Sequence, residues 1–149
     1  MSDEGRARHA GLIARRAGGP WRGVLVEGPA GAGKSDVALR ALDQGFSLVA
    51  DDRVILWTSG GRLFGRAPDA LFGLLEVRGL QVVAVPALPL AEVALVARCG
   101  TPERIPQVEF VELLGISVPL IVLDPREASA AAKLSRALDR FDLGGKRRI

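Results

Sequence analysis

The sequence predicts an α/β fold in which a P-loop-containing mixed sheet carries an antiparallel hairpin and flanking helices. Three observations predict it. An apolar run at residues 23–27 leads into residues 28–35, which match G-x-x-x-x-G-K-[ST], and a helical pattern follows at once. Residues 58–61 (Thr-Ser-Gly-Gly) separate two strand-like segments, as in a β-hairpin. A second helical pattern closes the chain, so helices flank the strands.

The first third of the chain is expected to alternate strands with a helix. Val37, Ala38, Ala41 and Leu42 recur at helical spacing, and Gly45 is placed to end that helix. In order, the sequence predicts strands at residues 9–14 and 23–27, a helix at 35–43 and a strand at 47–50.

The rest of the chain is richer in strands. Pro119 lies near the start of the last of them and predicts an edge position. Asp124 as N-cap, Pro125 at the first helical position and Glu127 three residues after the cap form a capping box, which predicts a helix reaching about Phe141. The expected elements are hairpin strands at 53–57 and 62–66, one or two helical turns at 69–75, and strands at 81–85, 93–97, 108–113 and 118–123.

Composition excludes several classes of protein. The 149 residues carry a net charge of +3, with 48% hydrophobic and 25% charged residues, which is typical of one globular domain spanning 1–149. No apolar run approaches the ~20 residues that cross a bilayer. The acidic start of the chain is unlike a secretory signal and predicts a cytoplasmic protein. Few aromatic residues accompany the basic ones, so we expect no nucleic acid partner.

The P-loop motif predicts nucleotide binding. Its glycines allow backbone N–H groups to turn toward a phosphate, and the helix after it points its positive end at the same place. Lys34 would neutralise the β- and γ-phosphates, and Ser35 offers a hydroxyl to Mg²⁺. The expected nucleotide-binding residues are Gly28, Pro29, Ala30, Gly31, Ala32, Gly33, Lys34 and Ser35.

Two places offer the carboxylates that a P-loop needs for its metal and for the attacking hydroxyl. Asp51 and Asp52 follow the strand after the P-loop helix, which places them at the phosphate end of the sheet. A plain turn into the hairpin is the alternative for this pair. Asp124 follows the strand at 118–123 in the manner of a Walker B acid, although we favour a helix cap there. Adjacent acids favour a nearby cation, so Asp51 and Asp52 are the stronger candidates.

Two further segments are specific to one family. LVADDRV at residues 48–54 and LLEVRGL at 74–80 follow the P-loop in order, and RHAG at 8–11 precedes it. Over residues 8–85 the chain resembles the catalytic domain of bacterial HPr kinase/phosphorylase, in the short form found in alphaproteobacteria. The resemblance implies a fold of the HPr kinase and PEP carboxykinase type, ATP and Mg²⁺ as cofactors, and a serine of an HPr-like phosphocarrier protein as the substrate.

The resemblance also implies roles for single residues. Asp51 would be the general base that activates the substrate hydroxyl, and His9 the histidine near the phosphates. Arg78 would position phosphate or hold Glu76, for which a simple ion pair is the alternative. The implied catalytic residues are Asp51, His9 and Lys34, and the implied metal ligands are Ser35, Glu76 and Asp52.

The chain also departs from the family. Full-length members carry an additional N-terminal domain, and the Arg- and Pro-rich segment that helps them grip the protein substrate near the C-terminus is not found here. Kinase activity is therefore better supported than reverse phosphorolysis, and homo-oligomer formation stays open. Two other functions fit the motifs. One is a P-loop kinase of a small metabolite, or an ATPase, with Asp124 as its Walker B acid. The other is a nucleotide-sensing module without turnover.

Overall fold

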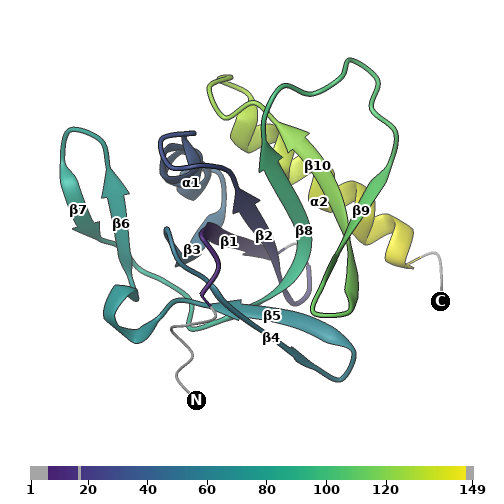
Figure 1. Cartoon of the computed structure of the whole chain (residues 1–149), viewed down its shortest axis with the longest axis horizontal. Helices are drawn as coiled ribbons and strands as arrows, with labels where there is room; N and C mark the ends of the chain where they lie inside the picture. The colour runs from purple at the N-terminus through teal and green to yellow at the C-terminus, as the bar shows by residue number, and fades with distance from the viewer. Residues whose placement is uncertain (1–6, 17, 147–149) are drawn as a thin grey trace.

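The computed structural model describes residues 7–16 and 18–146, which form a mixed sheet with helices on one side (Figure 1). The strands of the main sheet are β1 (Ala10–Arg16), β2 (Trp21–Glu27), β3 (Phe46–Ala50), β4 (Ile55–Ser59), β5 (Arg62–Arg66), β8 (Ala91–Cys99), β9 (Glu109–Leu113) and β10 (Ile116–Leu123). A separate hairpin consists of β6 (Leu74–Val77) and β7 (Gln81–Ala84), and the helices are α1 (Lys34–Leu42) and α2 (Ala130–Lys146).

The main sheet combines a parallel centre with antiparallel flanks. Its strand order is β3-β1-β2-β8-β10-β9, in which β2, β8 and β10 run parallel. Strand β1 is antiparallel to both β2 and β3, and β9 is antiparallel to β10. The β4–β5 hairpin joins through β5, which pairs with the start of β8. The mixed sheet and its hairpin are as the sequence predicts.

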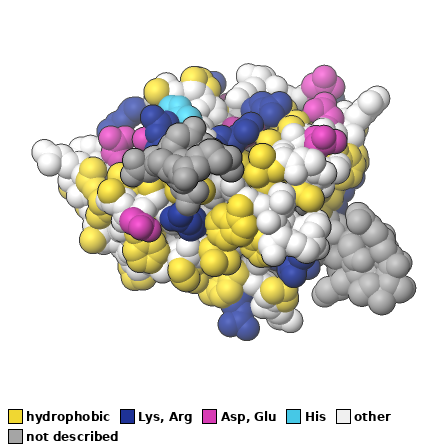
Figure 2. Space-filling view, turned by 60° about the horizontal axis from the view of Figure 1, so that its bottom comes forward, with side chains coloured by type: hydrophobic (Ala, Val, Ile, Leu, Met, Phe, Trp, Pro, Cys, Tyr) yellow, Lys and Arg dark blue, Asp and Glu magenta, His cyan; other side chains and the backbone are white. Residues whose placement is uncertain are grey.

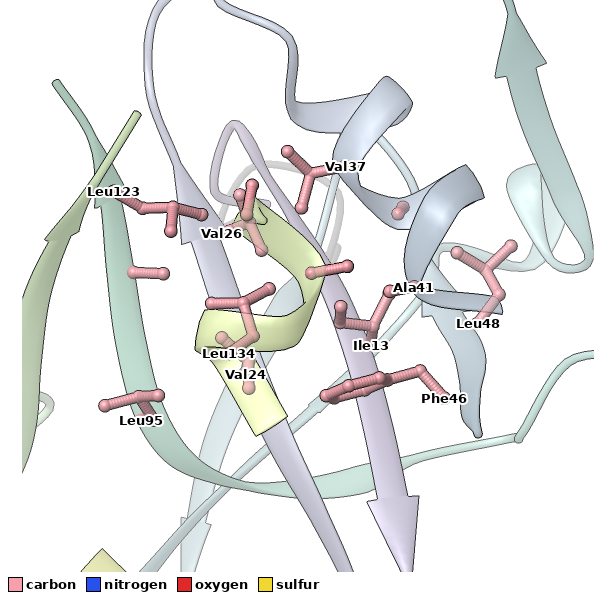
Figure 3. Close-up of a cluster of buried hydrophobic side chains, with 14 of the residues drawn as sticks. Ile13, Val24, Val26, Val37, Ala41, Phe46, Leu48, Leu95, Leu123 and Leu134 are labelled. Carbon is pink, nitrogen blue, oxygen red and sulfur yellow. The ribbon is translucent and has the colours of Figure 1, made fainter. Parts of the chain in front are cut away.

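Apolar side chains cover both faces of the central strands. Ile13, Val24 and Val26 point toward the helices and pack with Val37 of α1 and Leu134 of α2 (Figure 3). The alternate residues of these strands, Leu12 and Leu25, point to the other face, where they pack with Leu63 of the β4–β5 hairpin. Burial on both faces explains why the strands read as continuous apolar runs instead of alternating ones.

The segment after the hairpin departs from the prediction. Helical turns were expected over residues 69–75, and the structure has a single 3-10 turn at Asp69–Leu71. Leu74 and Leu75 belong instead to β6, which pairs antiparallel with β7. Because that pairing supplies the backbone hydrogen bonds, the apolar residues here form a strand. The β6–β7 hairpin stands beside α1 at one side of the molecule (Figure 1).

The predicted capping box is wrong. Helix α2 begins at Ala130, and residues 125–129 form turns and a bend. The Asp124 carboxylate accepts from the backbone N–H of Arg126 at 3.0 Å, which closes a tight turn and does not cap a helix. Arg40 of α1 donates to the backbone carbonyls of Pro125 and Glu127, and this contact holds both outside a helix. The helix also runs past the predicted end at Phe141, to Lys146.

The predicted edge position of the last strand is also wrong. Strand β10 lies between β8 and β9, and β9 is the edge strand on this side. Pro119 is tolerated because β10 pairs with β8 only from Leu120 onward. Pro119 itself lies opposite Phe110 of β9. The proline therefore falls outside the parallel pairing that its missing N–H would interrupt.

Two features of the structure concern the expectations about nucleic acid and membranes. On the face shown in Figure 2, Lys and Arg side chains are scattered among acidic and hydrophobic ones. Within the described ranges no helix has the length and apolar character needed to cross a membrane. Residues 1–4, on which the cytoplasmic expectation rests, lie outside the described residues, and the single domain over 1–149 stays a prediction.

Candidate active site

The P-loop connects β2 to α1 at one end of the parallel strands. Gly33 has φ 110°, a left-handed conformation that favours glycine. A Cβ atom there would lie 3.2 Å from Cβ of Pro125, so the turn after β10 closes directly over the loop. A Cβ on Gly28 would lie only 2.9 Å from Cβ of Cys99, at the end of β8. Neighbouring strand ends therefore shape both ends of the loop.

Lys34 is the first residue of α1 and is 8% exposed. Its ammonium group donates to the backbone carbonyls of Gly28 at 2.7 Å and Pro29 at 3.0 Å. These contacts hold the charge at the centre of the loop. An ammonium group carries three N–H donors, so one of them is left for a further acceptor such as a phosphate oxygen.

Asp51 joins the P-loop helix to the β6–β7 hairpin. It follows β3 directly and is 7% exposed. Its Oδ1 accepts from the Ser35 hydroxyl at 2.7 Å, and its Oδ2 accepts from the backbone N–H of Glu76 at 3.0 Å. Three segments that are distant in sequence thus meet at one buried carboxylate. The two bonds leave further lone pairs of the carboxylate for another donor.

Asp52 points the other way and contacts His9. Its φ of 70° is left-handed, and the Arg53 N–H donates to the Asp51 carbonyl at 2.8 Å, which makes a γ-turn centred on Asp52. The conformation is costly for a residue other than glycine, and such strain is common at functional sites. Asp52 Oδ1 lies 2.8 Å from Nε2 of His9. The turn therefore separates the two adjacent carboxylates into different surroundings.

Two cavities meet at this place. The larger, about 460 Å³, lies over the P-loop and the start of α1, with His9, Asp52 and Glu76 on its walls. The smaller, about 250 Å³, has a polar side formed by Ser35, Asp51, Asp52 and Glu76. Leu71, Leu74 and Val82 form its apolar side. Every site residue that the sequence predicts lines one of these cavities except Gly28 and Pro29, which hold Lys34 through their carbonyls.

Sequence reasoning missed part of the larger cavity. Pro125 and Arg126 line it, although they lie some 90 residues after the P-loop. Their approach depends on the β2-β8-β10 strand order, which no local pattern reveals. Arg78 lines the same cavity, and its anticipated ion pair with Glu76 is absent. In the described part of the chain Arg78 makes no hydrogen bond or ion pair.

Asp124 and Cys99 lie near the P-loop with structural roles. The backbone N–H of Arg126 is the main cause that lowers the pKa of the Asp124 carboxyl, helped by the Arg126 side chain. Asp124 lines neither cavity, so the geometry gives no support to a Walker B acid at this position. Burial raises the pKa of the Cys99 thiol, which fits a packing residue more than a nucleophile.

The oxygen atoms around the smaller cavity fit a hard cation. Ser35 supplies a hydroxyl, and Asp52 and Glu76 supply exposed carboxylates. Among the described residues no three acidic, histidine or cysteine side chains are close enough to hold a metal by themselves. Mg²⁺ requires no such cage, because it keeps several waters and is usually bound by one or two carboxylates together with substrate phosphates.

Part of the chain matches a known protein family. The family model described as the HPr Serine kinase C-terminal domain matches residues 21–89, which contain the P-loop, both aspartates and Glu76. Over this region the chain is similar to the HPr serine kinase family. Residues 8–11, which contain His9, and everything after residue 89 fall outside the match.

Curated proteins named HPr kinase/phosphorylase are similar over a stretch of comparable length. The HPr kinase/phosphorylase of Clostridium perfringens is 46% identical over 66 residues, which are 44% of this chain and 22% of that protein. The protein of the same name from Clostridium tetani has the same identity and coverage. That of Brevibacillus brevis is 47% identical over 64 residues, 42% of this chain and 21% of that protein. The chain thus matches about a fifth of the length of these relatives.

A solved member of the HPr kinase family extends the likeness to the whole fold. The Hpr(Ser) kinase/phosphatase of Coxiella burnetii superposes with a TM-score of 0.80 and is 25% identical. The superposition covers 94% of this chain and 98% of that one. The region after residue 89, which the family model does not match, therefore shares the architecture of that protein. The predicted fold class is confirmed.

Proposed function

We propose that the chain is an ATP- and Mg²⁺-dependent serine kinase that phosphorylates an HPr-like phosphocarrier protein. The observation that carries the proposal is the Asp51 carboxylate, which binds both the P-loop hydroxyl of Ser35 and the backbone of Glu76. This contact joins a nucleotide-binding element to the two segments that distinguish the family. The names of the relatives, HPr kinase/phosphorylase and Hpr(Ser) kinase/phosphatase, support the choice of substrate.

The proposed chemistry is transfer of the γ-phosphoryl group of ATP to a serine hydroxyl. Lys34 and the P-loop N–H groups hold the phosphates, and the larger cavity accommodates the nucleotide. Asp51 accepts the serine proton as the serine oxygen bonds to the γ-phosphorus, and the bond from the γ-phosphorus to the β,γ-bridging oxygen breaks to release ADP. Ser35, Glu76 and Asp52 are the proposed Mg²⁺ ligands. The ion, when bound, neutralises charge on the phosphates.

Some observations support a second assignment, in which Asp51 and Asp52 exchange their roles as general base and metal ligand. Asp51 is buried against Ser35, the residue that offers Mg²⁺ a hydroxyl in a P-loop. Asp52 is exposed, lines the larger cavity and contacts His9, which suits a group that meets an incoming hydroxyl. In this assignment Asp51 orients the metal and Asp52 takes the proton.

The proposal also includes the reverse reaction, phosphorolysis, for which fewer observations speak than for the kinase reaction. Phosphorolysis would use the same aspartate as general acid, and the relatives' printed names include phosphorylase or phosphatase. Arg126, at the wall of the larger cavity, is the one arginine that the turn after β10 brings there. We infer that kinase activity is the forward function.

The test is transfer of labelled γ-phosphate from Mg-ATP to purified HPr of the same organism. The wild-type chain is expected to label HPr on serine. Asp51→Asn is expected to reduce labelling by about 10²-fold or more, the usual contribution of a general base. Asp124→Asn is the control, because it alters a carboxylate at a neighbouring strand end that lines neither cavity, and it should label HPr at the wild-type rate.

Other outcomes identify the rival functions. ATP turnover without labelling of HPr, lost in Asp124→Asn but kept in Asp51→Asn, indicates a metabolite kinase or an ATPase with a Walker B acid. Stabilisation of the chain by ATP with no phosphate released over hours indicates a nucleotide-sensing module. Either result contradicts the HPr kinase proposal.

A further inference from the structure

A buried carboxylate beside the P-loop takes no part in the proposed chemistry. Glu27 is the last residue of β2, is 8% exposed and lines neither cavity. Its Oε2 accepts from Arg8 Nε at 2.6 Å, and its Oε1 accepts from Arg98 Nη2 at 3.3 Å. A buried carboxylate requires such partners, because an unpaired buried charge is strongly destabilising. The side chain of Arg8 is therefore drawn firmly to the end of β2.

Arg8 is also held through its backbone. Its N–H donates to the Val54 carbonyl at 2.7 Å, and its carbonyl accepts from the Val54 N–H at 2.9 Å. Val54 lies two residues after Asp52, so this bridge joins the segment before β1 to the γ-turn after β3. With Glu27 on one side and Val54 on the other, Arg8 has little freedom to move.

His9 follows Arg8 and takes its position from it. The chain bends at His9, so the residue directly after the anchored Arg8 is turned across to Asp52, with its Nε2 2.8 Å from Asp52 Oδ1. The side chains of His9 and Asp52 are 39% and 58% exposed, and such an exposed pair contributes little by itself. In the pair of Arg8 with Glu27 the arginine side chain is 41% exposed, but the glutamate side chain is only 10% exposed and so is less screened by water. The firmer restraint on residues 8 and 9 is therefore the pair between Arg8 and Glu27.

We propose that Glu27 is a positioning residue that acts through Arg8 to hold His9 against Asp52 at the wall of the larger cavity. The effect on phosphoryl transfer rests on the function proposed above, whereas the effect on His9 does not. Glu27 itself lines neither cavity. Its place immediately before Gly28 means that the same residue ends the strand leading into the nucleotide loop and orients the histidine across from it.

The structural part of the proposal can be tested by NMR, because His9 is the only histidine of the chain. Its ring signals are expected to shift in Asp52→Asn, and to move in the same direction in Arg8→Met and in Glu27→Gln. Arg8→Met leaves Glu27 paired with Arg98 and so avoids an unpaired buried charge. Glu92→Gln is the matched control, since it removes the pair with Arg62, also 2.6 Å long, and should leave the His9 signals unchanged.

Two results overturn the structural part. The first is His9 signals that stay at their wild-type positions in both Arg8→Met and Glu27→Gln while Asp52→Asn moves them. The second is an Asp52→Asn variant in which they do not move, because His9 would then not contact Asp52. Far-UV circular dichroism of each variant establishes that the comparison concerns folded protein.

The kinetic part uses transfer to HPr and keeps the two proposals distinguishable. Glu27→Gln is expected to lower kcat by about 10- to 100-fold at an unchanged KM for ATP, because misplacing a group by ~1 Å costs up to 10²-fold. The double variant with His9→Ala should be as slow as His9→Ala alone. Losses that multiply give Glu27 a role independent of His9 and overturn the proposal. A wild-type chain that labels no HPr refutes the proposed function and leaves the NMR result intact.

Discussion

At the scale of single residues, the site depends on two adjacent carboxylates with opposite surroundings. Asp51 is buried and accepts hydrogen bonds from Ser35 and Glu76, whereas the Asp52 side chain is 58% exposed beside His9. The γ-turn at Asp52 produces this separation, because it directs consecutive side chains into different environments. Environment decides which of two neighbouring carboxylates works as acid or base and which orients charge.

The two assignments of Asp51 and Asp52 differ in how activity depends on Mg²⁺. Asn at the position of the base should lower kcat by about 10²- to 10⁴-fold at every Mg²⁺ concentration, because proton removal is lost. Asn at the position of the metal ligand should raise the Mg²⁺ concentration needed for half-maximal rate and recover part of the rate at high Mg²⁺. We expect Asp51→Asn to behave as the base variant, measured by transfer to HPr across a Mg²⁺ titration.

The opposite pattern, with recovery in Asp51→Asn and none in Asp52→Asn, would assign the base to Asp52. Glu92→Gln serves again as the control, since it alters an acid remote from both cavities. Recovery in both variants contradicts a general base at either position.

Sequence reasoning found these residues because their signals are local. The P-loop is one continuous motif, and both aspartates directly follow a strand that the apolar pattern reveals. The contact between Asp51 and Ser35 follows in outline from the strand–helix–strand order. The role of Glu27 left no signal, because a glutamate at a strand end is ordinary until Arg8 and Arg98 are brought to it from elsewhere in the chain.

At the scale of elements, Arg40 connects α1 to the turn that carries Pro125 and Arg126. Its guanidinium donates to the carbonyls of Pro125 and Glu127. Arg40 lies on α1, the helix whose first residue is Lys34 of the P-loop. The wall of the larger cavity after β10 is therefore attached to the P-loop helix by one side chain. This attachment overrides the local capping signal at Asp124, which sequence alone read as a helix start.

Arg40→Met should reduce the free energy of unfolding by about 1–3 kcal/mol, because two partly buried carbonyls lose their donor. Urea denaturation followed by circular dichroism measures the change. Asp36→Asn is the matched control: it removes only the exposed pair between Asp36 and Arg40, 3.0 Å long, which is worth about 0.3–0.5 kcal/mol. Equal losses in the two variants would contradict the proposed link between α1 and the turn.

At the scale of the whole molecule, the sheet is covered on both faces. Leu134 of α2 is fully buried on the helix face, and Leu63 of β5 is 1% exposed on the face that the β4–β5 hairpin covers. The strands between them, buried on both sides, couple the two layers. The hairpin is thus part of the structural core, and the site end of the sheet rests on both layers.

Leu134→Ala and Leu63→Ala should each lower the free energy of unfolding by about 2–5 kcal/mol, the usual cost of a cavity in a packed core. Leu80→Ala is the control, because Leu80 is 69% exposed, and it should change stability by less than about 0.5 kcal/mol. Trp57 stacks on Phe64 within the hairpin, and the other tryptophan, Trp21, lies in β2, so in a Trp21→Phe background tryptophan fluorescence reports the hairpin and circular dichroism the helices. Separate transitions in the two signals would contradict a single cooperative unit.

The sequence by itself determined the P-loop, the strand–helix–strand unit around it, the antiparallel hairpin and the polar residues from His9 to Glu76 that line the two cavities. Each of these depends on neighbours in the chain: glycine spacing, turn residues and the period of apolar positions. The tertiary structure alone decided where α2 begins, that β10 is an internal strand, that residues 74–77 form a strand, and that Arg126 and Glu27 belong to the surroundings of the site. Those features arise from hydrogen bonds and packing between segments far apart in sequence. The free energy of these long-range contacts outweighs the local conformational preferences of the sequence.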